Sequence, residues 1–228
     1  MSRRICHFIT VIAIALIVGG CPSLWNTVRA PGEEPTPELL FKKGKNLFDD
    51  KKYQEAIQVL ESLKSAHPDF ENMPEVYMKL ADASFEKGAY DDAASRFKQF
   101  LELYPNHEDT VRAKYMVGMC YFNQIKRIDL DSTALVHAAE EFKTVVDRGG
   151  ESEWKKKAEE KYRECRKRLG EKELYKAQNY LNQSQYRAAR LAAQRVLDEY
   201  KDLGLDDQAK AIVAKTEGRV PKEPEPEK

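Results

Sequence analysis

Apolar residues in the middle of the chain recur with the spacing of one face of an α-helix. Residues 53–68 and 90–105 align without gaps at a period of 37 residues, and both place apolar side chains at i, i+3, i+7 and i+10. Pro68 and Pro105 close the two stretches, because proline denies the next amide donor and ends a helix. The chain between 37 and 217 shows neither strand-like alternation nor an Asn-Gly or Asp-Gly hairpin turn. The pattern therefore predicts an all-α protein.

The segments that precede these two stretches repeat as well. Residues 39–53 match residues 76–90 at the same period. Pro37 and Pro74 stand at plausible first helical positions, and Gly88 supplies a left-handed C-terminal cap. Each repeat is thus predicted to be a pair of helices, and small residues at two positions let the pair approach closely. The first position holds Gly44, Ala81 and Gly118, and the second holds Ala56, Ala93 and Ala138.

This unit resembles the tetratricopeptide repeat, with slightly longer links than its usual length of about 34 residues. A third copy covers residues 109–148, with an enlarged loop at 125–133, and a fourth covers 174–201. The charged segment 153–169 joins them as a helix, and the pattern leaves open whether that helix continues through Gly170. Residues 205–217 are predicted to form a capping helix that is polar outside. We expect a superhelical solenoid of about five helix pairs, with N-terminal repeats in 37–150 and C-terminal repeats plus cap in 151–217.

The N-terminus carries a second pattern. Arg3 and Arg4 precede an apolar run over 8–18, which is too short to span a membrane and is typical of a secretory signal peptide. The run ends in Val-Gly-Gly-Cys, which resembles the lipobox of bacterial lipoproteins. By that resemblance residues 1–20 are removed and Cys21 receives the lipid. A plain signal peptide with an incidental cysteine, or a twin-arginine signal, stays open as an alternative.

A lipid on Cys21 would leave the rest of the chain as a soluble body on a membrane anchor. Residues 21–36 are proline-rich without periodicity and are predicted to be an extended tether, and residues 218–228 to be a disordered tail. Pro22, rather than an aspartate, follows the cysteine. By resemblance to sorting rules in bacteria with two membranes, this predicts lipid anchoring at the periplasmic face of the outer membrane.

Composition excludes some functions. The chain has 38 basic and 38 acidic side chains, and without residues 1–20 the basic residues number two fewer, so no polybasic nucleic-acid binder is expected. His67, His107 and His137 lie far apart, and none has Asp, Glu or Cys at metal-ligand spacing. No nucleophile elbow or phosphate loop is present, so we expect neither catalysis nor a cofactor. Cys120 and Cys165 lie in helical patterns that favour buried free thiols, although a disulfide stays open.

In a stacked solenoid the first helices of the repeats line a concave face. Two columns of side chains recur there at the 37-residue period, and polar residues flank them. The columns predict either a groove for an extended peptide with bulky side chains, or simple packing between helix pairs. For the column of Phe41, Met78 and Tyr115 we favour exposure to the groove. The candidate groove residues are Phe41, Phe48, Asp49, Met78, Asp82, Phe85, Tyr115, Met119, Phe122 and Asn123.

A cluster of arginines decorates the predicted second helix of repeat four. Arg187, Arg190 and Arg195 stand within nine residues, either as a docking surface for an acidic partner or as a solvated helix face.

The lipobox, the short tether and the repeats together resemble the BamD (ComL/YfiO) family. The stretches that carry the resemblance are 38–63, 101–125 and 164–189. The resemblance implies a non-enzymatic lipoprotein subunit of the outer-membrane β-barrel assembly machinery. It implies that the N-terminal groove binds the aromatic-ending signals of unfolded outer-membrane proteins. It further implies that the C-terminal repeats dock on the POTRA domains of a BamA-like barrel subunit, beside other lipoproteins of the machinery.

The strongest alternative is a periplasmic tetratricopeptide adaptor of the Tol-Pal, cell-division or peptidoglycan-synthesis systems. Such adaptors typically carry a coiled coil before the repeats and a cleaved signal without lipid. No heptad pattern precedes residue 37, and Cys21 favours the lipoprotein.

Overall fold

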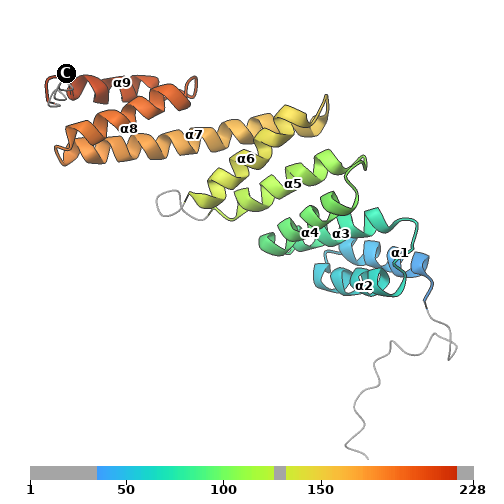
Figure 1. The fold of residues 1–228 in the computed structure, drawn as a ribbon. Helices are drawn as coiled ribbons and strands as arrows, with labels where there is room; N and C mark the ends of the chain where they lie inside the picture. The colour runs from blue at the N-terminus through green and yellow to red at the C-terminus, as the bar shows by residue number, and fades with distance from the viewer. Residues whose placement is uncertain (1–34, 126–131, 220–228) are drawn as a thin grey trace, which may run out of the picture. The chain divides into compact units, whose positions relative to one another are not determined.

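The computed structural model describes residues 35–125 and 132–219, and its helices follow one another as antiparallel pairs (Figure 1). The predicted signal peptide, Cys21, most of the tether, most of the repeat-three loop and most of the tail lie outside these residues. Within them all regular structure is α-helical, which confirms the all-α, tetratricopeptide-like solenoid. The helices are α1 (Pro37–Asp49), α2 (Tyr53–Ala66), α3 (Met73–Glu86), α4 (Tyr90–Leu103), α5 (Thr110–Asn123), α6 (Thr133–Arg148), α7 (Glu153–Asn182), α8 (Tyr186–Glu199) and α9 (Asp206–Lys215).

Helix pairing depends on the small residues that the repeat alignment identified. A Cβ atom added at Gly44 would lie 2.5 Å from Leu60 of α2, and one added at Gly118 would lie 2.7 Å from Phe142 of α6. Both distances are shorter than real contacts of a Cβ atom, so a larger residue would push the paired helices apart. Ala56 of α2 is fully buried. The prediction that small residues let the pair approach closely is confirmed at Gly44 and Gly118.

In repeats one, two and four, whose turns the structure describes, the turn has the same left-handed backbone conformation at the same position. Gly88 has a φ of +82°, as predicted for a left-handed cap. Lys51, 37 residues earlier, has a φ of +60°, and Ser184 in repeat four has a φ of +59°. A positive φ brings the Cβ atom of a non-glycine residue close to the backbone, whereas glycine adopts it without strain. Lys51 and Ser184 therefore have strained backbones at the position where repeat two has Gly88.

The long helix α7 answers the question that the sequence left open. It runs 30 residues without interruption through Gly170, so the charged linking segment and the first helix of repeat four are one element. Ser152 caps its start by accepting a hydrogen bond from the Lys155 amide. Gly170 is buried, and an added Cβ atom would lie 2.6 Å from Leu205. The absence of a side chain therefore lets the segment between α8 and α9 pack directly on the helix.

In the described part of the chain, buried apolar residues form four clusters that follow one another along the sequence. Three of them, in the N-terminal repeats, are built around phenylalanines, among them Phe97, Phe100 and Phe142, which are fully buried. The fourth, between α7, α8 and α9, holds alanine, leucine, valine and isoleucine. The aromatic residues of the sequence thus go mainly into the N-terminal interior.

Both cysteines in the described helices are free thiols, as the helical patterns favoured. Cys120 and Cys165 are fully buried, each in an apolar cluster. Burial raises the pKa of each thiol to about 12, with nearby carboxylates adding to the effect. Neither thiol is therefore a reactive nucleophile near neutral pH.

Candidate peptide-binding face

The first predicted column, Phe48, Phe85 and Phe122, is half-buried and packs within its own repeats. Phe48 meets Tyr53 edge to face with ring centroids 5.4 Å apart, and Phe85 meets Tyr90 in the same way at 5.4 Å. Each contact joins the end of the first helix of a repeat to the start of the second. The column thus fixes the helix hairpin, and the remaining exposed ring surface is what a ligand could contact.

Cationic side chains lie over two rings of this column. The Lys79 ammonium is 4.5 Å from the ring centre of Phe48, and the Lys161 ammonium is 4.4 Å from that of Phe122. The Arg168 guanidinium is 4.9 Å from the same Phe122 ring. The cation in each case comes from a helix other than that of the ring. Glu164 forms ion pairs with both Lys161 and Arg168, so the positive charge over Phe122 is partly neutralised. The face is therefore a set of aromatic rings in contact with cationic side chains, not a bare aromatic ladder.

The second column lies in the interior. Phe41, Met78 and Tyr115 are 8%, 3% and 9% exposed, so the expectation that they face an open groove is wrong. Phe70, in the link between repeats one and two, packs edge to face on Phe41 at 5.6 Å. The ring of Trp154, at the start of α7, has its centroid 5.4 Å from that of Tyr115. These three side chains therefore fill space in the interior and expose little of their own surface to a ligand.

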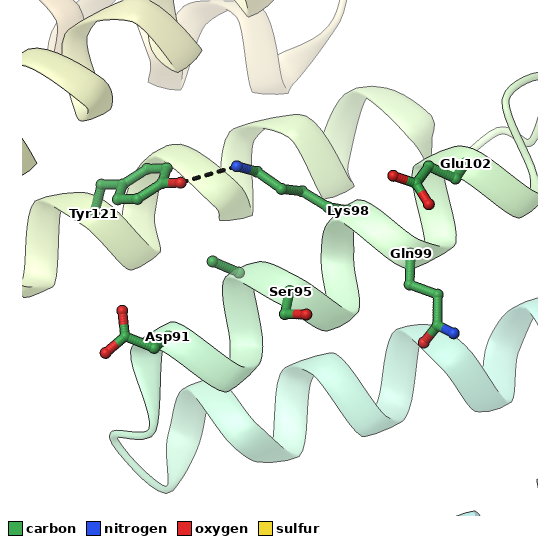
Figure 2. A pocket seen from close by; sticks show the side chains of 7 residues that line it. Asp91, Ser95, Lys98, Gln99, Glu102 and Tyr121 are labelled. Carbon is green, nitrogen blue, oxygen red and sulfur yellow. Dashed lines mark hydrogen bonds between the residues drawn. The ribbon is translucent and has the colours of Figure 1, made fainter.

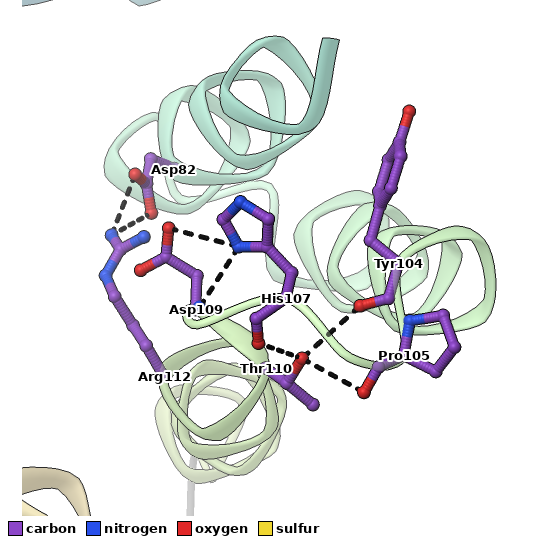
Figure 3. A network of polar contacts seen from close by, with 7 residues as sticks. All are labelled: Asp82, Tyr104, Pro105, His107, Asp109, Thr110 and Arg112. Carbon is purple, nitrogen blue, oxygen red and sulfur yellow. Dashed lines mark hydrogen bonds and ion pairs between the residues drawn. The ribbon is translucent and has the colours of Figure 1, made fainter. Parts of the chain in front are cut away.

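One of the polar candidates is already paired. Asp82 of α3 is 8% exposed and accepts two hydrogen bonds from Arg112 Nη2 of α5, at 2.7 and 2.8 Å (Figure 3). The guanidinium also lies 6.0 Å from the Trp154 ring. Asp82 thus joins repeat two to repeat three, and a peptide would have to compete with Arg112 for its oxygens.

The remaining groove candidates differ in exposure. Met119 is half-buried against the third apolar cluster. Asp49 and Asn123 are exposed at the ends of α1 and α5. Asn123 lines a surface hollow of about 550 Å³ together with Asp91 and Gln124. The Gln124 Nε2 atom is buried there and has no hydrogen-bond acceptor among the described residues.

A second polar hollow lies between α4 and the end of α5 and was not predicted (Figure 2). Its volume is about 580 Å³, and one stripe of α4 forms most of its wall. Lys98 Nζ donates a 2.8 Å hydrogen bond to Tyr121 Oη across it, and this bond raises the pKa of Lys98. The sequence pattern of this stripe, which includes Asp91, Ser95 and Glu102, predicts only a solvent-exposed helix face. Only the position of Tyr121 reveals the hollow.

The arginines of α8 are exposed as expected, but they are not equivalent. Arg195 already contacts Glu173 at 3.2 Å and Glu199 at 3.9 Å. Arg190 is exposed and makes no ion pair within residues 35–125 and 132–219. Between Arg190 and Arg195, Leu191 is 62% exposed. It lies off the buried face that Ala189, Ala193 and Val196 form, a signal that the sequence analysis did not use. The candidate docking surface is thus an exposed leucine flanked by arginines.

Two of the histidines, His107 and His137, contact aromatic rings. His107 packs edge to face on Phe100 at 5.4 Å, and its Nδ1 atom accepts a 3.1 Å hydrogen bond from the Asp109 amide (Figure 3). His137 lies 5.3 Å from the Tyr121 ring. The described helices hold no group of three or more His, Cys, Asp or Glu residues arranged as metal ligands. Nor does any of these helices have the length and apolar character needed to cross a membrane.

Repeated helix pairs, close contacts at small residues and a shared turn conformation define a tetratricopeptide-like repeat protein. The chain belongs to the YfiO family of outer membrane lipoproteins, whose family model matches residues 33–220.

Curated relatives agree with this family. "Outer membrane protein assembly factor BamD" of Caulobacter vibrioides is 26% identical over 89% of this chain and 72% of its own length. The proteins of the same name from Rickettsia prowazekii and Vibrio cholerae are each 24% identical, over 84% of this chain and 75% and 82% of their lengths.

Solved repeat proteins are similar to parts of the chain at lower identity. The TPR2AB domain of yeast Sti1 in its pHSP90 complex is 15% identical and covers 78% of this chain and 70% of its own, with a TM-score of 0.45. The Thermus thermophilus TPR protein TTC0263 is 16% identical and covers 78% of this chain and all of its own, with a TM-score of 0.43.

Proposed function

We propose that this protein is a non-enzymatic assembly factor of the outer-membrane β-barrel assembly machinery. The observation that carries the proposal is family membership across residues 33–220, with relatives named as outer membrane protein assembly factors. A repeat fold suits such a role because stacked helix pairs expose long surfaces for other proteins. Lipidation at Cys21 would hold the helical body at the periplasmic face of the outer membrane, since lipid chains alone can anchor a protein.

We further propose that the N-terminal repeats bind unfolded outer-membrane proteins through aromatic-ending signals. The half-buried rings of Phe48 and Phe122 lie under lysines, so an aromatic side chain could meet a ring while its carboxylate meets the ammonium group. The buried Gln124 amide nitrogen has no acceptor among residues 35–125 and 132–219, and a peptide carbonyl would supply one. Asn123 lies beside it for further hydrogen bonds.

Docking on POTRA domains of a BamA-like subunit is assigned to α8. Arg187 and Arg190 offer charge, and arginine is enriched among the residues that carry most of the binding energy of interfaces. Leu191 adds exposed apolar surface beside them. Other lipoproteins of the machinery are expected in the same assembly.

The first test is partner identification. The intact lipoprotein is purified from detergent-solubilised membranes, and its partners are identified by mass spectrometry. We expect a POTRA-containing barrel subunit to dominate. Dominance of Tol-Pal or peptidoglycan-synthesis proteins without that subunit would contradict the proposal and favour the adaptor alternative.

The second test addresses peptide binding. Fluorescence anisotropy compares a labelled peptide that ends in phenylalanine with the same peptide ending in alanine. Lys161→Glu is expected to weaken binding of the phenylalanine peptide about fivefold, because a carboxylate would replace one of the two cations at the Phe122 ring and leave only Arg168. Lys156→Glu, an exposed position on the same helix, is the matched control and should leave affinity unchanged. Equal effects of both substitutions would point to net charge rather than to a site.

A further inference from the structure

The outer surface at the start of α8 contains an apolar hollow. Its volume is about 460 Å³, and Tyr186, Ala188 and Leu191 provide its apolar lining. Leu191 is 62% exposed although it sits in the middle of a helix. A tyrosine ring, an alanine and an exposed leucine in one hollow form a surface that another chain segment would stabilise by covering it.

The surroundings of this hollow are positively charged. Residues 174–197 contain Lys176, Arg187, Arg190 and Arg195 and no aspartate or glutamate. Arg195 stands further along α8, toward its C-terminus, and already forms ion pairs with Glu173 and Glu199. Arg187 and Arg190 precede Leu191 by four residues and one residue, and both are exposed. An acidic segment is therefore the occupant that the charges favour.

The chain itself delivers such a segment to the hollow. Arg219, the last described residue, lines the hollow, and its Nη1 atom donates a 3.3 Å hydrogen bond to Tyr186 Oη. Its guanidinium lies 5.1 Å from the Tyr186 ring centre. The next nine residues, 220–228, read VPKEPEPEK, with prolines at 221, 224 and 226. Glutamates stand at 223, 225 and 227 and lysines at 222 and 228, so the side chains sum to −1, with the acidic residues in the middle of the segment.

We infer that residues 220–228 dock along α8, with Val220 and the prolines over Leu191 and the glutamates toward Arg187 and Arg190. At about 3.1 Å per residue an extended nine-residue segment reaches roughly 28 Å, and the 14 residues of α8 span about 21 Å, so the tail is long enough. The prolines limit the conformational entropy lost on docking. Attachment at Arg219 keeps the segment at a local concentration in the millimolar range.

Docking of the tail would give α8 two competing occupants. The surface that the tail covers is the one assigned above to the POTRA-containing partner, so a partner would have to displace the tail. That consequence rests on the proposed function. The docking itself does not, and it is tested on the isolated protein.

The experiment measures alkylation of a cysteine placed in the hollow. Ala188→Cys keeps Leu191 in place, and the native Cys120 and Cys165 react slowly because burial raises each pKa to about 12. The rate of iodoacetamide modification at position 188 is read by peptide mass spectrometry, in the full-length lipoprotein in detergent and in a chain truncated after Arg219. Circular dichroism checks that both chains keep their helices.

At 50 mM salt we expect modification to be at least about threefold slower in the full-length chain, since most tails would be docked at a millimolar local concentration. At 1 M salt the rates should converge, because screening then acts within about 3 Å. Glu223→Lys, Glu225→Lys and Glu227→Lys together should remove the protection without shortening the chain. The control Ala66→Cys, exposed at the end of α2, should react equally fast in every version.

Two outcomes would overturn the inference. Equal rates at low salt with and without residues 220–228 would mean that the tail does not cover the hollow. Protection that persists in the truncated chain and grows with protein concentration would mean that a second copy covers it instead. Neither outcome depends on which proteins copurify, so this test and the test of the proposed function fail separately.

Discussion

Repeat one (α1 and α2) and repeat two (α3 and α4) have the same fold, and each forms an ion pair from its first helix to the first helix of the next repeat. The charges of the two partners are reversed between these two junctions. Lys45 of α1 pairs with Glu75 of α3 at 3.0 Å, and 37 residues later Asp82 of α3 pairs with Arg112 of α5 at 2.7 Å. The residues of each pair are 30 positions apart. The geometry is thus a property of the repeat, while the sign of the charge is a property of each junction.

The second helices show the same reversal. Glu61 of α2 pairs with Arg96 of α4, whereas Lys98 of α4 attracts Glu141 of α6. A repeat stacked on the wrong neighbour would place like charges opposite one another at these positions. We interpret the alternation as a device that selects the order of the repeats, since like charges opposite each other are unfavourable.

The two first-helix junctions differ most in burial, which gives the largest expected effect. Asp82→Ala leaves the Arg112 guanidinium, 25% exposed, without its carboxylate, and should lower the free energy of unfolding by about 2 kcal/mol. Lys45→Ala breaks a pair whose side chains are 42% and 46% exposed and should cost less than about 0.5 kcal/mol. Urea unfolding followed by Trp154 fluorescence, in a Trp25→Phe background, measures both. Equal costs would remove the distinction between the junctions.

The turns of the two repeats offer a smaller effect of predictable sign. Gly88→Ala forces a Cβ atom into a left-handed conformation and should cost about 1 kcal/mol. Lys51→Gly relieves the same strain at the same place in repeat one and should stabilise by roughly 0.5 kcal/mol, because glycine's greater freedom in the unfolded chain offsets part of the gain. Ser184→Gly serves as an independent check in repeat four. Destabilisation by both Lys51→Gly and Ser184→Gly would show that the turns are not strained.

The second-helix charges predict opposite pH dependences of small size. Burial alone would raise the pKa of Glu61, but its bonds and ion pairs with Lys64 and Arg96 outweigh burial and lower it. Glu61 therefore stabilises the fold above the carboxyl pKa of the unfolded chain, and this contribution is lost as pH falls through the lowered pKa. Glu61→Gln should cost stability at pH 7 and nothing at the acid end of that window.

Glu141 has the opposite sign. Burial, helped by Glu140, raises its pKa against the attraction of Lys98. Its contribution is fully present below the unfolded pKa and is lost as pH rises through the raised pKa. Glu141→Gln should therefore stabilise the protein at pH 7 relative to wild type, and the difference should vanish at low pH. Thermal melts of Glu61→Gln and Glu141→Gln between pH 3 and pH 7 measure the change in Tm relative to wild type. The same pH dependence of that change in both variants would contradict the opposite pKa shifts of Glu61 and Glu141.

Most of the fold could be predicted because the repeat period carries it. The helix pairs, the glycine approach points and the turn at Gly88 follow from residues that recur every 37 positions. Burial of the second column could not, because its covering residues stand outside the period. Phe70 lies in a link between repeats, and Trp154 begins a helix that matches no earlier one. Opposite charges at the same spacing, Lys45 with Glu75 and Asp82 with Arg112, were a signal in the sequence that could have revealed the paired state of Asp82.

The uninterrupted helix α7 has a mechanical consequence. Its 30 residues extend about 45 Å, packing on α5 and α6 near one end and on α8 and α9 near the other. Glycine weakens the interior of a helix, and α7 places Gly170 between these two sets of neighbours. There Tyr200 and Leu205 press on it from the segment that follows α8. The weakest point of the helix is thus supported by packing from its neighbours. A force on the N-terminal repeats would therefore move α7 as one rigid helix and reach repeat four directly.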